Sequence, residues 1–250
     1  MKRYADYELA SVSMASDELF LRTLDKVFTE NPTVDILESG TYLGMGSTTS
    51  LAASLIRNKA KVNKFFTIEA DFDLFRQASQ NLKKFDFITP IWGLSVSVKE
   101  AADFIAKDEA IKNHEKYPDV FIDEIDNPTA FYTNEIEGKL SDGNFEKSWR
   151  SRLKSKLDRV KFTFKEDCFK ELLPQLENLP VVLLDSAGGL GYLEFTRVVT
   201  FFSKKNYILI LDDIHHLKHF RSFEYIKTHR EFKILGQDLK NGWVIAQHSV

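Results

Sequence analysis

Glycine, glutamate and hydroxyl side chains gather in one short segment, residues 38–49. Gly40, Gly44 and Gly46 follow Glu38 with the spacing G-x-x-x-G-x-G, and Ser47 comes next. Glycines let a backbone turn tightly and approach a ligand closely, and a helix start offers N–H groups to an anion. The segment therefore predicts a ligand-binding turn between a strand and a helix; a tight turn without a ligand is the alternative. The spacing is neither the G-x-G-x-x-G fingerprint nor a P-loop.

An acidic residue, Glu69, is expected where the next strand ends. A carboxylate at this position can accept hydrogen bonds from the two hydroxyls of a ribose. The alternative is a surface glutamate beside the cap of the helix that Asp71 starts. Its place relative to the glycine segment favours the ribose interpretation.

Three aspartates follow two later apolar runs. Asp185 follows one run, and Asp212 and Asp213 follow the next. The carboxyl ends of neighbouring parallel strands meet in one crevice, where three carboxylates repel each other unless a cation or proton is shared. A hard divalent cation such as Mg²⁺ takes oxygen ligands of this kind. These residues are therefore predicted metal ligands, and Asp185 and Asp212 are also predicted to act in catalysis. The alternative is that Asp212 or Asp213 caps the following helix.

Histidines follow the aspartate pair directly. His215 and His216 lie nearest to the expected strand end, with His219 farther along. The pKa of a histidine lies near working pH, so one of them could act as a general base. Surface histidines on an exposed helix are the alternative interpretation.

Short apolar runs alternate with helical patterns and must position these residues. Strands are expected at residues 34–38, 65–69, 87–91, 181–185 and 207–211, with helices at 47–57, 71–82, 193–202 and 220–226. Such alternation predicts parallel βαβ units with helices on both faces of a sheet. Residues 232–235 and 243–246 flank the turn signal Asn241-Gly242, which predicts a hairpin. The predicted fold class is α/β: a Rossmann-like doubly wound sheet of five parallel strands plus a C-terminal antiparallel hairpin.

The alternation stops between the third and fourth expected strands. Residues 98–165 are charged, aromatic and irregular after a helical stretch at 98–112, and they are interpreted as an inserted lid. Phe131, Tyr132 and Trp149 in it are expected to form an acceptor pocket, while its basic run from Lys147 to Lys165 fits either a solvated face or an acidic ligand. With a helical segment in residues 1–30, where Ser16 can cap a helix over 16–28, the chain is expected to form a single domain, 1–250.

Composition narrows the class of protein. The chain of 250 residues is 43% hydrophobic and 28% charged with a net charge of −3, as in ordinary globular proteins. Its 34 basic residues are outnumbered by 37 acidic ones, so no nucleic-acid partner is expected. The uncharged stretch 39–56 is too rich in Gly, Ser and Thr for a membrane span. One cysteine, Cys168, and no visible signal peptide predict a cytoplasmic location.

The motif Glu38-x-Gly40-x-x-x-Gly44-x-Gly46-Ser47-Thr48, Glu69 after the second strand and the closing hairpin resemble class I S-adenosylmethionine-dependent methyltransferases. The small-molecule O-methyltransferase branch is the most similar, and the resemblance covers residues 34–94 and 181–248. It implies S-adenosylmethionine as cofactor and, in metal-dependent members, Mg²⁺ or another divalent cation at Asp185, Asp212 and Asp213. The chain departs from the family at Trp92–Ser95 and Ser186–Gly189. The residues that the resemblance places at the cofactor are Glu38, Gly40, Thr41, Tyr42, Gly44, Ser47, Thr48, Glu69, Gly93 and Asp185.

The function expected from this resemblance is methyl transfer to an oxygen of a small molecule or a sugar hydroxyl. Two alternatives stay open at this point. One is a nucleotide-binding or interaction protein of the same fold without transfer chemistry. The other is a nicotinamide-dependent oxidoreductase, against which the missing G-x-G-x-x-G speaks. The partner expected is a small-molecule or sugar acceptor, and a homo-oligomer is left open.

Overall fold

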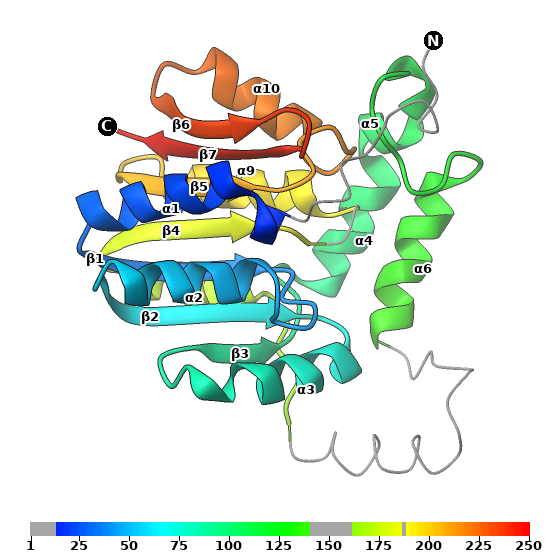
Figure 1. Ribbon diagram of the computed structural model, residues 1–250. Helices are drawn as coiled ribbons and strands as arrows, with labels where there is room; N and C mark the ends of the chain where they lie inside the picture. The colour runs from blue at the N-terminus through cyan, green and yellow to red at the C-terminus, as the bar shows by residue number, and fades with distance from the viewer. Residues whose placement is uncertain (1–13, 141–161, 187–188) are drawn as a thin grey trace.

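A seven-stranded sheet with the order β3-β2-β1-β4-β5-β7-β6 forms the centre of the molecule (Figure 1). The computed structural model describes residues 14–140, 162–186 and 189–250. The first five strands pair in parallel, and β7 joins β5 and β6 antiparallel. The predicted fold class is thereby confirmed. The strands are β1 (Thr33–Ser39), β2 (Lys61–Glu69), β3 (Thr89–Trp92), β4 (Leu179–Leu184), β5 (Tyr207–Leu211), β6 (Phe232–Asp238) and β7 (Trp243–His248).

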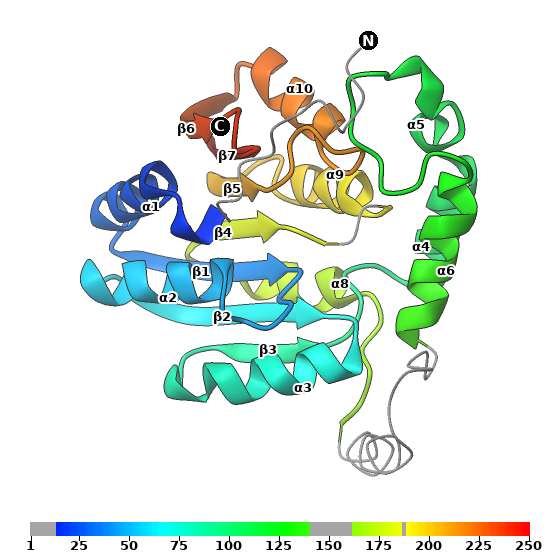
Figure 2. The same cartoon turned by 45° about the vertical axis from the view of Figure 1, so that its right-hand side comes forward.

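Helices cover both faces of this sheet, as the two views show (Figures 1 and 2). Successive residues of β1 point to opposite faces, so Ile36 packs into one core and Leu37 into the other, both fully buried. One face carries α1 (Glu18–Glu30), α2 (Ser47–Arg57) and α3 (Phe72–Asn81). The other carries α8 (Cys168–Leu172), α9 (Gly191–Phe201) and α10 (Phe220–Thr228).

The expected boundaries need three corrections. Helix α1 begins at Glu18 because Asp17, not Ser16, caps it: its Oδ1 accepts the N–H groups of Leu19 and Phe20 at 2.8 and 3.1 Å. The third strand begins at Thr89, since a turn in which the Ile88 N–H bonds to the carbonyl of Phe85 precedes it. The helical stretch 98–112 is two helices, α4 (Val98–Lys107) and α5 (Glu109–Lys112), because Asp108 is extended between them and caps the second.

The described part of the insertion lies at the end toward which the parallel strands point (Figure 2). Helices α4, α5 and α6 (Pro128–Leu140) share a third apolar cluster, with Ile105, Ile111 and Tyr132 among its buried members. The cluster includes Leu190, directly before α9, and Leu193 in the first turn of α9, so these helices pack against the start of α9. Trp149 and residues 147–161 of the basic run lie outside the described residues. No helix in the described ranges is long and apolar enough to cross a membrane.

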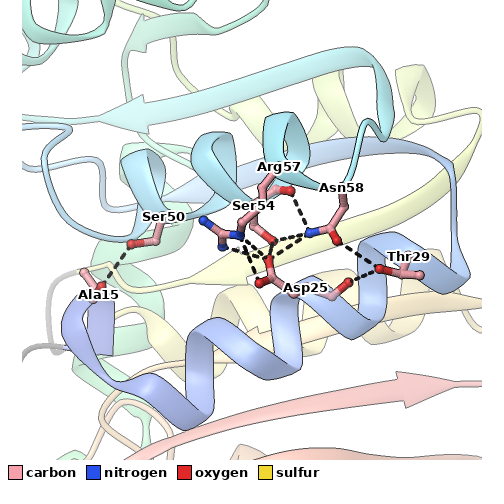
Figure 3. Close-up of polar contacts among 7 residues, drawn as sticks. All are labelled: Ala15, Asp25, Thr29, Ser50, Ser54, Arg57 and Asn58. Carbon is pink, nitrogen blue, oxygen red and sulfur yellow. Dashed lines mark hydrogen bonds and ion pairs between the residues drawn. The ribbon is translucent and has the colours of Figure 1, made fainter.

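A partly exposed polar network joins α1 to α2, and Asp25 is at its centre (Figure 3). The Asp25 carboxylate accepts hydrogen bonds from Ser54 Oγ at 2.5 Å, Asn58 Nδ2 at 2.8 Å and two guanidinium nitrogens of Arg57. Thr29 Oγ1 donates to Asn58 Oδ1 at 3.0 Å and extends the network by one helical turn. Because α2 carries the glycine segment at its start, this contact fixes the helix that positions the segment.

Replacing Asp25 with alanine should lower the free energy of unfolding by about 1–2 kcal/mol, because three side chains lose their common acceptor at a partly exposed site. Partial burial would raise the pKa of Asp25, but the donors from Arg57, Ser54 and Asn58 lower it below its ordinary value. A lowered folded-state pKa gives stability that is present above the unfolded pKa, about 3.9, and is lost as pH falls.

Urea denaturation of wild type and Asp25→Ala at several pH values tests this expectation. The difference between the two proteins should shrink below pH about 4. Asp86→Asn, at an exposed site, is the control and should change little. A difference that grows in acid would show that the Asp25 network is not stabilised by its charge.

Candidate active site

A cavity of about 440 Å³ opens at the carboxyl ends of the parallel strands. Its volume falls within the roughly 300–1,000 Å³ of small-molecule sites. The glycine segment and the ends of β2, β3 and β4 form one part of its wall, and the insertion and the segment after β5 form the other. Five of the ten residues predicted at the cofactor line it: Gly40, Tyr42, Glu69, Gly93 and Asp185.

Gly40 turns the chain sharply at the end of β1. Its φ of +93° is in the left-handed region, and a Cβ there would lie 2.0 Å from the carbonyl oxygen of Asp185. Its N–H donates to the Ile68 carbonyl at 3.0 Å, so the turn is tied to β2 on one side and pressed against β4 on the other. Only glycine fits such a position without strain.

The other five predicted cofactor residues do not line the cavity: Glu38, Thr41, Gly44, Ser47 and Thr48. The Ser47 and Thr48 hydroxyls, expected at an anionic group, instead donate to the buried Glu38 carboxylate at 2.6 Å each. Thr67 Oγ1 donates to the same carboxylate at 2.7 Å. Burial raises the pKa of Glu38 despite these three donors. These side chains hold the turn in place, which corrects their expected ligand-contacting role.

Glu69 stands at the end of β2 on the cavity wall. Its two carboxylate oxygens accept the backbone N–H groups of Tyr42 and Asp71, each at 2.8 Å. These bonds fix the orientation of the carboxylate, which has about four acceptor sites in all. Asp71 caps α3 as predicted, through the N–H groups of Asp73 and Leu74.

Gly93 is next on the wall, one strand farther along the sheet. A Cβ at Gly93 would lie 2.3 Å from the carbonyl oxygen of Lys165, where the chain returns from the insertion. Its N–H donates to the Glu69 carbonyl at 3.0 Å, which ties the ends of β2 and β3 together. Gly93 and the next two residues, Leu94 and Ser95, all line the cavity.

Lys218 occupies the place where a metal ion was predicted. Its ammonium group bonds to Asp185 Oδ1 at 2.8 Å, to Asp213 Oδ2 at 2.9 Å and to the Ser186 carbonyl at 3.3 Å, and its side chain is only 7% exposed. Burial alone would lower its pKa, but the carboxylates of Asp185 and Asp213 raise it above the ordinary value. The cation that compensates Asp185 and Asp213 is therefore Lys218 of the same chain.

The described residues do not offer the predicted metal site. In the ranges 14–140, 162–186 and 189–250, no three acidic, histidine or cysteine side chains are grouped to hold a metal ion. Lys218 separates Asp185 from Asp213. Burial and the neighbouring Asp185 and Asp213 charges raise the pKa of Asp212 well above its ordinary value. The ligand set Asp185, Asp212 and Asp213 therefore does not fit a divalent cation.

The two predicted catalytic histidines point to different places. His215 is exposed outside the cavity, and its Nε2 lies 2.6 Å from the Leu239 carbonyl, which corrects its expected role. His216 is buried on the cavity wall. Its Nδ1 accepts the N–H of Lys218 at 3.1 Å, and its Nε2 lies 3.1 Å from Asp123 Oδ2. Because an amide only donates, Nδ1 is the acceptor in the first contact, and both ring nitrogens are already in contact with other groups.

Several wall residues were not found from the sequence. Glu194 on α9 is fully buried and accepts Ser39 Oγ at 2.6 Å and Ser186 Oγ at 2.7 Å, which joins the ends of β1 and β4. Burial raises its pKa. Asp123 and Glu135 come from the irregular insertion, where no pattern marked them. Lys218 follows the aspartate and histidine cluster, but its spacing carries no known signal.

Comparisons with known proteins show fold likeness only. No family model matches the chain, and no curated protein matches it. Similar solved structures include an O-methyltransferase from Bacillus cereus in complex with SAH, at 14% identity over 96% of this chain and 84% of that one, with a TM-score of 0.49. Another is the O-methyltransferase TomG from Streptomyces achromogenes in complex with SAM, at 13% identity over 92% of this chain and 79% of that one, with a TM-score of 0.46. The SAH-bound methyltransferase PaMTH1 from Podospora anserina has 11% identity, 94% and 80% coverage and 0.46. Likeness at this level carries no argument about activity, which must rest on the site itself.

Replacing Lys218 with methionine should destabilise the protein by about 2–4 kcal/mol, because it leaves the Asp185 and Asp213 carboxylates without their cation. Adding Asp185→Asn to this variant should restore part of the loss, since the neutral amide removes one of the repelling charges. Urea denaturation measures both. Lys227→Met, which removes an exposed lysine from α10, is the matched control and should cost under about 0.5 kcal/mol.

Mg²⁺ provides an independent check on the same interpretation. Millimolar Mg²⁺ should leave the melting temperature of the wild type unchanged, since an ion that binds the folded state alone would raise it. A rise of several degrees would mean that the metal displaces Lys218, and the charge assignment would then be wrong.

Proposed function

We propose that the protein is an S-adenosylmethionine-dependent methyltransferase that methylates an oxygen of a small molecule or a sugar hydroxyl. The observation that carries this proposal is one cavity wall on which Gly40, Glu69, Gly93 and Asp185 stand together at the ends of four adjacent strands. Ligands of doubly wound sheets bind in this crevice, at the switch point of strand order. Here the order reverses between β1 and β4.

The wall supplies groups suited to each part of this cofactor. Glu69 can accept the hydroxyls of the ribose, and the main chain at Gly93 and Leu94 can meet the adenine. The turn at Gly40 lets the methionine end approach the backbone. When bound, the cofactor supplies a methyl group on a positively charged sulfur.

Asp185 is the proposed base for the acceptor hydroxyl. The Lys218 ammonium donates to Asp185 Oδ1, and the Asp185 side chain is 28% exposed at the cavity. In the transfer, the acceptor oxygen forms a bond to the methyl carbon as the carbon–sulfur bond breaks, and the hydroxyl proton passes to a carboxylate. Lys218 holds Asp185 in position, and the lid residues exclude water, so that positioning supplies most of the rate. His216 has no unused basic nitrogen for this step.

Calorimetry with S-adenosylmethionine tests the proposal. We expect binding by the wild type and an affinity at least ten-fold lower for Glu69→Gln, because the amide loses an acceptor and turns an N–H toward backbone donors, a loss of roughly 1.4 kcal/mol or more. Asp86→Asn should bind like wild type, and NAD should give no heat. A folded wild type that binds no S-adenosylmethionine would sink the proposal, whereas binding of NAD alone would favour an oxidoreductase.

A further inference from the structure

The cavity extends from the cofactor wall to a second, acidic wall. Asp123, Phe121, Phe131, Tyr132 and Glu135 line it there, and all come from the insertion. Phe121 is held to the segment after β5, since its N–H donates to the His215 carbonyl and its carbonyl accepts from Leu217, both at 2.8 Å. Three strand spacings, roughly 14 Å, separate β5 from the strand that carries Glu69. The second wall is therefore distinct from the ribose and adenine positions.

Asp123 keeps its negative charge at this wall. Its side chain is 35% exposed; burial alone would raise its pKa, but the contact with His216 and the charge of Lys218 lower it. Among described residues that line the cavity, Lys218 is the single lysine or arginine, and its ammonium already bonds to Asp185 and Asp213. No lysine or arginine of the described cavity lining therefore bonds to Asp123.

Tyr132 adds a buried polar group aimed at the same space. Its side chain is fully buried on the cavity wall, and its hydroxyl has no partner at ordinary hydrogen-bond geometry although Asp123 is close. Buried hydroxyls without a partner are rare, because each costs free energy. Phe131 and Phe121 also line the cavity, where the ring of Phe131 lies 5.4 Å from that of Tyr132 and the ring of Phe121 lies 5.0 Å from that of His216. A cation with an organic frame matches such surroundings, since aromatic faces and a carboxylate both attract it.

We propose that the methyl acceptor carries a protonated amine, which Asp123 binds between the aromatic side chains of the lid. This inference rests on the proposed methyl transfer and names the charge class of its acceptor. The amine serves as a handle, and the hydroxyl of the same molecule faces Asp185. Asp123 is then a specificity-determining residue, and His216 is the positioning residue that orients its carboxylate.

Two sets of probes test the proposal on the full chain saturated with S-adenosylhomocysteine. Tyramine, 4-ethylphenol and 4-hydroxyphenylacetate share a phenol and differ in charge; glucosamine and glucose do the same for a sugar. Dissociation constants come from calorimetry or saturation-transfer NMR. At least one amine should bind about five- to ten-fold more tightly than its neutral counterpart, and the acid should bind most weakly. The pair that shows the preference distinguishes an aryl from a sugar frame.

Variants assign the preference to a residue. Asp123→Asn should bring the amine and its neutral counterpart within about two-fold of each other, while Glu137→Gln, which removes the same charge from an exposed site on α6, should leave the preference intact. Melting temperatures verify that both variants fold. Equal binding within each set, failure of both amines to bind, or a preference that survives Asp123→Asn overturns the proposal. Absence of S-adenosylhomocysteine binding would instead overturn the proposed function.

Discussion

The ion pairs of a buried lysine hold the two halves of the site together. Lys218 follows β5, yet its ammonium lies against Asp185 at the end of β4 and Asp213 at the end of β5. A buried ammonium is costly unless it is paired, so the chain after β5 has little freedom to move away. The N–H of the same residue fixes the ring of His216, which faces Asp123 in the lid. One residue thus couples the sheet edge, the segment after β5 and the insertion.

The glycine turn depends on a second buried polar group, the Glu38 carboxyl. Three hydroxyl donors from two elements converge on this carboxylate, two from α2 and one from β2. These hydrogen bonds fix the start of α2 next to the turn, while Asp25 joins the other end of α2 to α1. A ligand-binding turn gains precision when side chains beneath it are locked in this way.

The fold could be predicted because its signals are local. The runs 181–185 and 207–211 are uniformly apolar, as strands covered on both faces must be, and Asn241-Gly242 marks the hairpin. Gly40, Tyr42, Glu69, Gly93 and Asp185 could be placed at the site because parallel strands deliver their carboxyl ends to one edge. The partners of side chains could not be predicted. Nothing in the sequence shows that Ser47 and Thr48 turn to Glu38, that Lys218 reaches Asp185 across 33 positions, or that Asp123 meets His216, because these contacts arise only when distant segments pack.

The return of the chain from the insertion has a consequence for the edge of the sheet. The N–H of Lys165 donates to the Trp92 carbonyl, and the Lys165 carbonyl accepts from Leu94, so this segment adds a short rung beyond β3. Pro90, in the middle of β3, has no N–H to offer. Edge strands with unused backbone groups recruit other chains and promote aggregation. With a proline inside it and a rung across its end, β3 offers a second molecule few groups to pair with, and the lid connection protects the sheet as well as covering the site.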